Sequence, residues 1–294
     1  MTVLVTGATG NVGGATVRAL VARGEHVRAL VRDPQRGRER LGGGVELVIG
    51  DFSDRPSVRR AMRGVDRLLL SSADGPDKVA HETAVVDEAV AAGVELIVKA
   101  SALRAQSGSP LPPFDWNGRI EDHVRQAWIP AVNLRAGFYM TNLLAAAQPV
   151  RDAGALFAPA GTGAVAMIDP RDVGAVAAAV LTGKGHEGRD YVLTGAEAIT
   201  YEQVAEALGA ATRRPVAYVD VPPQAAREAL AASGAPAWLV EHLDLFFELV
   251  RRGELEETTD TVRMLTGREP RSFAAFARDH AGLFEAGAAA AVGA

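Results

Sequence analysis

The sequence predicts an α/β protein in which a doubly wound parallel sheet is followed by a smaller, mostly helical region. Over the first half of the chain, short β-branched apolar runs alternate with longer segments whose apolar residues recur at helical spacing. Such alternation favours a parallel sheet covered on both faces, and right-handed crossovers make that sheet doubly wound. A glycine-rich turn joins the first run to the first helical segment. Beyond about Phe138 the strands become scarce and the helical segments more frequent, which indicates a second region of different architecture.

The expected elements follow the chain in a regular order. Strands are expected at residues 2–6, 25–32, 45–51, 66–72, 94–101 and 131–137, and helical segments at 11–23, 53–63, 76–92 and 114–128. Farther along, the patterns predict helices at 169–181, from Thr200 behind its threonine cap, and over most of 223–284, with strands at 189–195 and 216–221. We therefore expect a first domain over residues 1–150, to which some later segments return, a smaller domain over 151–286 and a flexible tail over 287–294.

Composition argues against several classes of function. The chain has 294 residues, a net charge of −5 and no cysteine. A mildly acidic protein is a poor electrostatic match for nucleic acid or an anionic membrane, and without cysteine there is no disulfide, thiol nucleophile or cysteine metal site. The six histidines lack metal-ligand spacing, so no metal is expected. No apolar run approaches about 18 residues and the first residues lack the pattern of a secretory signal, so we expect a cytoplasmic protein without a membrane span.

The glycine-rich turn has the sequence TGATGNVGG, from Thr6 to Gly14. It fits the pattern TGxxGxxG between a first strand and a first helix, where a Rossmann-type fold binds the pyrophosphate of a dinucleotide. Gly7 would permit the tight turn, Gly10 would let the pyrophosphate approach the backbone, and Gly13 would let the helix lie close to the strands. The helix N-terminus would add N–H groups and partial positive charge, and Thr9, Asn11 and Val12 would line the phosphate. A turn without ligand is the alternative, but the surrounding strands and helix favour nucleotide binding.

The end of the second strand indicates which dinucleotide is bound. A protein that binds NAD usually places an acidic residue there to hold the ribose hydroxyls, whereas this chain has Arg32 directly after Val31. A guanidinium matches the geometry of a 2′-phosphate, and Arg36 and Arg38 add positive charge nearby. Asp33 could pair with Arg32 or accept a ribose hydroxyl. We favour NADP (as NADPH) over NAD as the cofactor.

Polar residues follow the later strands, at the edge of the sheet where ligands bind. Asp51 could reach the adenine amine, with Phe52 beside the ring, or it could cap a helix that starts near Asp54; both alternatives stand. The fourth strand ends at residues 71–72 and the fifth at residues 99–101. These residues should therefore face the nicotinamide half of the cofactor.

Together the motifs resemble those of atypical short-chain dehydrogenase/reductases of the NmrA-like group. Besides the glycine turn, the similarity rests on LVRDP from Leu30, GDFSD from Gly50, NLRAGFYMTNLL from Asn133, DPRDVGAVAAAVL from Asp169, YVLTGAEAIT from Tyr191 and LTGREPRSFAAF from Leu265. It covers essentially the whole chain and is strongest to the branch of NAD(P)H:quinone reductases and triphenylmethane-dye reductases. The group also includes redox-sensing regulators. The resemblance implies a Rossmann domain and a smaller, mostly helical domain that binds substrate.

The resemblance also assigns residues to the cofactor and the acceptor. By position in the motifs, the dinucleotide would be contacted by Gly7, Thr9, Gly10, Asn11, Val12, Arg32, Asp51, Phe52 and Ser71. Lys99 and Ser101 would lie near the nicotinamide ribose. The loop that would close over the nicotinamide consists of Ala136, Gly137 and Phe138. Phe246 or Phe247 could line an aromatic acceptor pocket with Phe138, although their helical spacing is also typical of ordinary core packing.

One catalytic feature of typical short-chain dehydrogenases is missing. Those enzymes use a Tyr-x-x-x-Lys pair, in which the lysine lowers the tyrosine pKa and the tyrosine transfers a proton. None of the four tyrosines here precedes a lysine by four residues, and the corresponding segment, FDWNGRIEDHVRQA from Phe114, carries Asn117 and Glu121 where relatives often show His-x-x-x-Glu. Asn117 cannot titrate and could only orient a substrate or water, and Glu121 is typical of a helix-surface or supporting residue. The catalytic residues stay open, with Asn117, Glu121 and Lys99 as candidates.

Three functions fit these observations. The first is an NADPH-dependent oxidoreductase that passes hydride to a quinone or similar conjugated small-molecule acceptor, because orientation can supply much of the rate and water the proton. The second is a regulatory protein that senses NAD(P) without turnover, and the third is a biosynthetic reductase of one specific metabolite. We favour the first, as a monomer or homodimer with no direct nucleic-acid or membrane partner.

Overall fold

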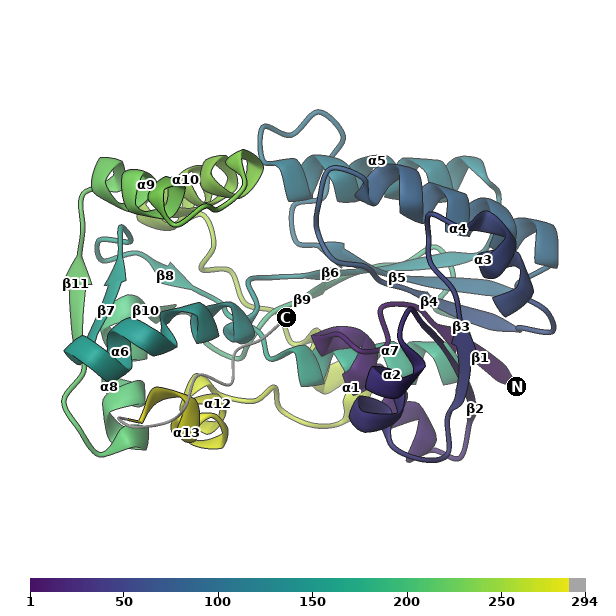
Figure 1. The fold of residues 1–294 in the computed structure, drawn as a ribbon, viewed down its shortest axis with the longest axis horizontal. Coiled ribbons are helices and arrows are strands. Elements are labelled where there is room, and N and C mark those ends of the chain that lie inside the picture. Colours follow the sequence, from purple (N-terminus) through teal and green to yellow (C-terminus); the bar gives the residue numbers. More distant parts are fainter. Residues whose placement is uncertain (286–294) are drawn as a thin grey trace. The chain divides into compact units, whose positions relative to one another are not determined.

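A seven-stranded parallel sheet organises the first part of the computed structural model, which describes residues 1–285 (Figure 1). Its strands are β1 (Thr2–Val5), β2 (His26–Val31), β3 (Glu46–Ile49), β4 (Arg67–Leu70), β5 (Leu96–Ala102), β6 (Ala131–Ala136) and β9 (Asp190–Leu193). They are ordered β3-β2-β1-β4-β5-β6-β9, and every neighbouring pair is parallel. The order reverses between β1 and β4, which is the switch point of a doubly wound sheet. The predicted Rossmann-type fold class is confirmed.

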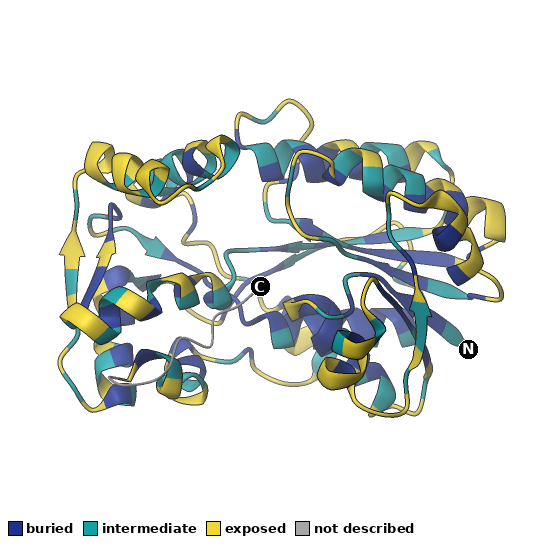
Figure 2. Ribbon diagram, viewed as in Figure 1, coloured by how far each residue is buried: buried dark blue, intermediate teal, exposed yellow. Residues whose placement is uncertain are grey.

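Helices cover both faces of this sheet (Figure 1). They are α1 (Asn11–Val21), α2 (Pro34–Leu41), α3 (Arg55–Ala61), α4 (Lys78–Ala92), α5 (Pro112–Gln126), α7 (Pro170–Thr182) and α11 (Thr261–Thr266). Helices α3, α4 and α5 lie on one face, and α1 and α7 pack together on the other. The core under the first face joins Leu4 and Ile97 of the strands to Val85 and Ile120 of the helices. Buried residues predominate along the central strands (Figure 2).

The chain forms two compact units that alternate along the sequence. The first unit comprises Met1–Ala136, Pro170–Leu193 and Thr261–Arg268, and the second comprises Gly137–Asp169, Thr194–Asp260 and the chain from Glu269 onward. The expected boundary near residue 150 thus falls inside the second unit. The later segments that return to the first unit contain α7, β9 and α11. The expected tail over 287–294 lies outside the described residues.

Helices α1 and α7 approach closely because a glycine lies at their interface. A Cβ atom on Gly174 would lie 2.5 Å from the Cβ of Ala15 and 2.8 Å from the backbone nitrogen of Thr16. Real Cβ atoms essentially never come so near to their neighbours, so only glycine fits there. The segment from residue 170 therefore packs directly against the helix that follows the glycine turn.

The second unit is mostly helical, as predicted, and contains two small sheets. Strands β7 (Ala155–Ala158) and β11 (Ala217–Asp220) pair in parallel, and β8 (Ala164–Val165) and β10 (Ile199–Thr200) pair antiparallel. Its helices are the 3₁₀ helix η1 (Met140–Ala146), α6 (Ala147–Ala153), α8 (Tyr201–Thr212), α9 (Pro223–Ala232), α10 (Ala237–Arg251), α12 (Phe273–Asp279) and α13 (Ala281–Phe284). The predicted threonine cap starts α8: Thr200 Oγ1 accepts from the Gln203 nitrogen over 3.2 Å. Among the described residues, we find no helix with the length and apolar character needed to span a membrane.

Candidate cofactor-binding site

In the turn between β1 and α1, side chains in place of two of the glycines would clash with neighbouring backbone atoms. Gly7 has a φ of +58°, which L-residues with side chains rarely adopt, and a Cβ there would lie 2.7 Å from the Ser71 carbonyl oxygen. A Cβ on Gly13 would overlap the Gly7 carbonyl. A Cβ on Gly10 would lie 3.2 Å from the Gly7 oxygen, a tight contact that a shift of a few tenths of an ångström would relieve, and Gly10 is exposed. The fold itself therefore requires Gly7 and Gly13, whereas Gly10 opens toward solvent, where a ligand would lie.

The first turn of α1 and a neighbouring arginine make this loop electropositive. Helix α1 begins at Asn11 with Gly10 as its N-cap. The first N–H groups of a helix have no acceptor within the helix, and the helix dipole adds partial positive charge. Arg40 of α2 donates to the Thr9 carbonyl over 3.1 Å and so brings a guanidinium to the same loop. Arg40 was not predicted as a site residue from the sequence, although its spacing of one helical turn from Arg36 was a usable signal.

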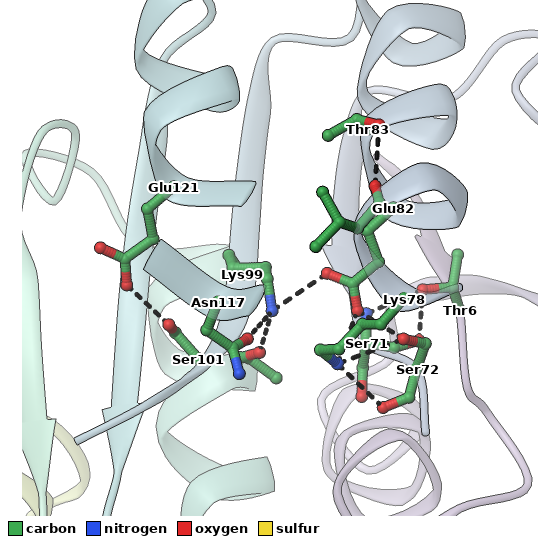
Figure 3. A network of polar contacts seen from close by, with 12 residues as sticks. Thr6, Ser71, Ser72, Lys78, Glu82, Thr83, Lys99, Ser101, Asn117 and Glu121 are labelled. Carbon is green, nitrogen blue, oxygen red and sulfur yellow. Dashed lines mark hydrogen bonds and ion pairs between the residues drawn. The ribbon is translucent and has the colours of Figure 1, made fainter. Parts of the chain in front are cut away.

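Thr6 fixes the glycine turn to the end of β4. The Thr6 nitrogen donates to the Leu69 carbonyl over 3.0 Å, and the Ser71 nitrogen donates to Thr6 Oγ1 over 2.9 Å. Figure 3 shows the second contact. The two sides of the switch point, β1 and β4, are thereby held at a fixed separation. Ser71, an expected cofactor contact, lies directly beside the turn.

At the end of β2 the charged residues have distinct roles. Arg32 is exposed, and Asp33 is the N-cap of α2. Asp33 Oδ1 accepts from the backbone nitrogens of Gln35 and Arg36, over 2.8 Å and 3.2 Å. From the sequence, Asp33 was considered as a partner of Arg32 or of a ribose hydroxyl. Its Oδ1 has neither role and instead caps α2. Arg32 and Asp33 are thus both exposed where β2 ends, with Asp33 Oδ1 directed at the first turn of α2.

Asp51 forms a turn after β3. Its Oδ1 accepts from the nitrogen and the hydroxyl of Ser53, over 2.8 Å and 2.6 Å. The Ser53 hydrogen bonds lower the pKa of Asp51, and the charges of Arg32 and His81 lower it further against the opposing effect of burial. Helix α3 starts only at Arg55, with Asp54 as its N-cap. Asp51 thus precedes the helix rather than capping it, and its second oxygen is the one that could face adenine.

Phe52 lies beside a histidine of α4. The Phe52 and His81 rings meet edge to face, with their centroids 6.4 Å apart. His81 was not predicted from the sequence, because nothing in the local pattern of α4 shows that packing brings this residue to the turn after β3. The two rings lie beside the turn that Asp51 forms after β3.

Lys99, near the end of β5, is enclosed by protein groups (Figure 3). Its fully buried ammonium lies 3.0 Å from Glu82 Oε2 and donates to Asn117 Oδ1 over 2.7 Å and to the Ala100 carbonyl. Burial lowers the pKa of Lys99 to about 8, against the opposing charge of Glu82. An ammonium has three N–H groups, and protein acceptors surround this one on three sides. Lys99 therefore supports the edge of the sheet from within.

Glu82 of α4 is the centre of this buried network. Lys78 lies 3.0 Å from Glu82 Oε1, and Ser72 Oγ donates to the same oxygen over 2.5 Å. Burial alone would raise the pKa of Glu82, but the charges of Lys78 and Lys99 outweigh it and lower the pKa to about 2. The network ties the ends of β4 and β5 to α4 and α5. Glu82 was not predicted from the sequence, although its i,i+4 spacing from Lys78 on one helix was a usable signal.

The α5 residues at the expected position of the catalytic pair both point toward the sheet (Figure 3). Asn117 accepts from the lysine of β5 and donates from Nδ2 to the Pro113 carbonyl over 2.7 Å. One turn later, Glu121 accepts from Ser101 Oγ over 2.6 Å. Asn117 and Glu121 are both buried. Of the roles considered for Glu121, the structure favours support of the strand over a place on the helix surface.

Residues 1–276 match the NmrA-like family. The chain belongs to the NmrA-like family. It is 36% identical over 284 residues to the NAD(P)H azoreductase of Xenophilus azovorans, covering 97% of this chain and 99% of that protein. It is 38% identical over 283 residues to the (4-alkanoyl-5-oxo-2,5-dihydrofuran-3-yl)methyl phosphate reductase of Streptomyces griseus subsp. griseus, covering 96% and 99%. The NADPH-dependent quinone oxidoreductase of Escherichia coli complexed with NADPH has a similar structure, with a TM-score of 0.85 at 29% identity and coverage of 95% and 99%. The resemblance drawn from the sequence motifs is confirmed.

In this NmrA-like protein, the glycine turn carries groups that suit the pyrophosphate of a dinucleotide. Gly10 is open to solvent at the start of α1, and the guanidinium of Arg40 lies against the same loop. These are the groups that a pyrophosphate requires: close backbone, N–H donors and positive charge. The buried network of Lys99 and Glu82 is directed inward, so its part is to hold the strand ends in place.

The second unit of the NmrA-like protein contains the aromatic residues expected to line an acceptor pocket. Phe138 and Phe246 stack with their centroids 4.7 Å apart, and Phe247 meets Phe246 edge to face at 5.4 Å. Phe246 is buried, while Phe138 and Phe247 are partly exposed. Of the expected closing loop, Ala136 ends β6 in the first unit, and the second unit begins at Gly137. Phe246 thus packs as a core residue, and Phe138 and Phe247 keep part of their apolar surface exposed.

Proposed function

We propose that this NmrA-like protein is an oxidoreductase that transfers hydride from NADPH to a quinone or a similar conjugated small-molecule acceptor. The observation that carries the proposal is the glycine turn, in which the exposed Gly10 and the start of α1 form a backbone cradle for a pyrophosphate. Family membership and relatives named for NAD(P)H-dependent reduction support the general activity. When bound, NADPH supplies the hydride, and residues of this chain bind and orient it.

NADPH is proposed over NADH because of the charges around the turn. Arg32 is exposed at the end of β2, and Arg40 lies against Thr9. Asp33 is committed to the N-terminus of α2, so the acidic group nearest Arg32 in sequence already has hydrogen bonds from backbone donors. Two guanidinium groups suit a 2′-phosphate better than two ribose hydroxyls, and Asp33 Oδ1 already accepts from the backbone of α2.

The site contacts are proposed as the resemblance assigned them, except for Lys99, whose buried ammonium is enclosed by protein acceptors. Along the glycine turn, Thr9, Asn11 and Val12 contact the phosphates. Asp51 and Phe52 contact the adenine. Ser71 and Ser101 face the nicotinamide half.

The acceptor is proposed to be electron-poor and conjugated because α5 offers no ready proton donor. Asn117 does not titrate, and both it and Glu121 are buried and hydrogen-bonded to neighbouring protein groups. A quinone or azo compound accepts hydride readily and can take its proton from water. Flat aromatic surface on Phe138 would hold such an acceptor by stacking.

The direct test is the absorbance of NADPH at 340 nm in the presence of purified protein and 1,4-benzoquinone, with NADH in a parallel cuvette. We expect consumption above the uncatalysed rate, faster with NADPH at limiting cofactor. Nicotinamide fluorescence in the same samples reports cofactor binding independently. Failure to bind NADPH at all would contradict the proposal.

A second candidate is a protein that senses NAD(P) without turnover. The specific observation in its favour is that α5 carries Asn117 and Glu121 in place of the Tyr-x-x-x-Lys pair. Binding of NADPH with no consumption on quinones, azo dyes or butenolides would favour the sensor. Turnover restricted to one compound would instead indicate a biosynthetic reductase, a third candidate.

A further inference from the structure

Ser101, Glu121 and Arg135 form a chain of hydrogen bonds where β5 and β6 end. Ser101 Oγ donates to Glu121 Oε1 over 2.6 Å. Arg135 holds both oxygens of the same carboxylate, with Nε 3.1 Å from Oε1 and Nη2 2.5 Å from Oε2. Arg135 also lies 3.2 Å from a carboxylate oxygen of Asp190 on β9. All four residues belong to the first unit, on three adjacent strands and α5.

This series of hydrogen bonds forms because the residue spacing on β5 matches the residue spacing on α5. Lys99 and Ser101 are two residues apart on β5 and so point to one face of the sheet, while Asn117 and Glu121 are four apart on α5 and share a helix face. The helix therefore places Asn117 against Lys99 and Glu121 against Ser101 (Figure 3). Arg135 is the direct register partner of Ser101 on β6. The two residues of β5 and the two of α5 are all buried, and Ser101 lies nearer than Lys99 to the carboxyl end of β5.

The carboxylate fixes the direction of the Ser101 hydrogen bond. A serine hydroxyl has one proton to donate and two lone pairs that accept. An ionised carboxylate can only accept, so the Ser101 proton must point at Glu121. Hydrogen bonding to Glu121 raises the pKa of Arg135, which keeps the clamp charged. Only the lone pairs of Ser101 Oγ are then left for another group.

We infer that Glu121, clamped by Arg135, is a positioning residue that makes Ser101 Oγ a hydrogen-bond acceptor for the nicotinamide half of NADPH. The inference rests on the proposed binding of the dinucleotide along the carboxyl edge of the sheet. The nicotinamide half carries suitable donors in its ribose hydroxyls and its carboxamide N–H groups. Glu121 of α5 thus acts through Ser101 of β5 and transfers no proton itself.

Glu121→Gln is the informative substitution because it keeps the shape of the side chain but replaces one accepting oxygen with a donating NH2 group. The carboxylate of Glu121 offers two acceptor oxygens to Ser101 and to the two Arg135 nitrogens. A glutamine side chain offers only one acceptor oxygen. If the oxygen stays next to Ser101, the amide group faces Arg135 Nη2, and two donors oppose each other. If the amide flips, it faces Ser101 and releases the serine proton toward the cofactor. The first arrangement loses the Arg135 clamp that holds the acceptor oxygen in place, and the second reverses the polarity of Ser101.

The test is the dissociation constant of NADPH and of 2′,5′-ADP for wild type, Ser101→Ala, Glu121→Gln and the double variant, by isothermal titration calorimetry. 2′,5′-ADP contains the adenosine and 2′-phosphate but no nicotinamide. Asp122→Asn is the matched control, because Asp122 accepts from Ser107 Oγ over 2.5 Å and from Arg125 over 2.6 Å on the exposed side of the same helix. The melting temperature of each variant reports folding.

We expect Ser101→Ala and Glu121→Gln each to weaken NADPH about tenfold, the loss of roughly one hydrogen bond, with 2′,5′-ADP unchanged. In the Ser101→Ala background, Glu121→Gln should add no further loss, because it acts through that hydroxyl. Asp122→Asn should bind both ligands like wild type. Equal weakening of both ligands, additive losses, or unchanged NADPH binding in Glu121→Gln would overturn the inference. Wild type that binds neither ligand would instead defeat the proposed function.

Discussion

At the scale of single residues, charge at the end of β2 is the proposed basis for a preference for NADPH over NADH. Arg32 is exposed there, and its neighbour Asp33 is held by the first turn of α2. The presence of Arg32 could be predicted from the sequence, as could its position after a strand. The partner of Asp33 and the approach of Arg40 to Thr9 could not, because both depend on where α2 begins and how it packs.

Arg32→Ala should weaken NADPH by about 10- to 100-fold, since a guanidinium–phosphate hydrogen bond contributes about 1.5–3 kcal/mol. NADH, which lacks the 2′-phosphate, should change little. Fluorescence titration with both cofactors measures the ratio. Arg63→Ala is the control, because it removes the same charge from an exposed position after α3. Equal losses for NADPH and NADH would reject the role of Arg32.

The buried Glu82 should make the free energy of unfolding depend on pH in acid. Its pKa is lowered from 4.5 to about 2 in the folded protein, mainly by Lys78 and Lys99 acting against burial. Because the folded pKa is depressed, this stabilisation is fully present above pH 4.5 and is lost as pH falls through 2. It amounts to about 3 kcal/mol.

Urea unfolding of wild type and Glu82→Gln between pH 5 and pH 2 measures this contribution. Wild type should lose stability more steeply than the variant over that window, because the glutamine cannot be protonated there. Parallel pH profiles would show that the network around Lys99 does not hold the charge of Glu82.

At the scale of elements, the regular strands and helices of the first half follow their sequence patterns, while short or polar elements do not. β1 to β6 were expected because their apolar β-branched runs are bounded by turns. Strand β8 is two residues long and β7 is ALFA, too short and alanine-rich to show a period. Helix α2 was missed because its charge run buries only Gly37 and Leu41. Asp33 followed by Pro34 was a usable N-terminal signal for it.

Two glycines of one turn should respond differently to valine. Gly10→Val should leave the fold intact, because its Cβ meets only the Gly7 oxygen at 3.2 Å, but should abolish NADPH binding. Gly13→Val should destabilise the protein by several kcal/mol or prevent folding, because its Cβ would overlap the backbone of Gly7. Circular dichroism melting and fluorescence titration separate the two effects. Gly10→Val with wild-type affinity would refute the phosphate cradle.

At the scale of the whole molecule, the chain passes between its two units several times. The first unit needs α7, β9 and α11, which come from far along the sequence. The sequence predicts these elements and their return in general terms. It cannot show that Gly174 packs against Ala15, because that contact joins positions about 160 residues apart and leaves no local period.

A fragment of residues 1–150 should therefore fail to fold cooperatively. Without β9 the edge of β6 is unpaired, and without α7 the apolar face of α1 is uncovered. Thermal melting by circular dichroism and size-exclusion chromatography should show a broad transition and aggregation. A sharp transition near that of the full chain would contradict the division into these units.

We propose that a dinucleotide held by the glycine turn donates hydride to a conjugated acceptor. The measurement that tests it most directly is NADPH consumption at 340 nm with 1,4-benzoquinone for wild type and folded Gly10→Val side by side. Turnover by wild type and only the uncatalysed rate with Gly10→Val is the predicted result. Equal rates for the two proteins, or no turnover by a wild type that binds NADPH, would contradict the claim.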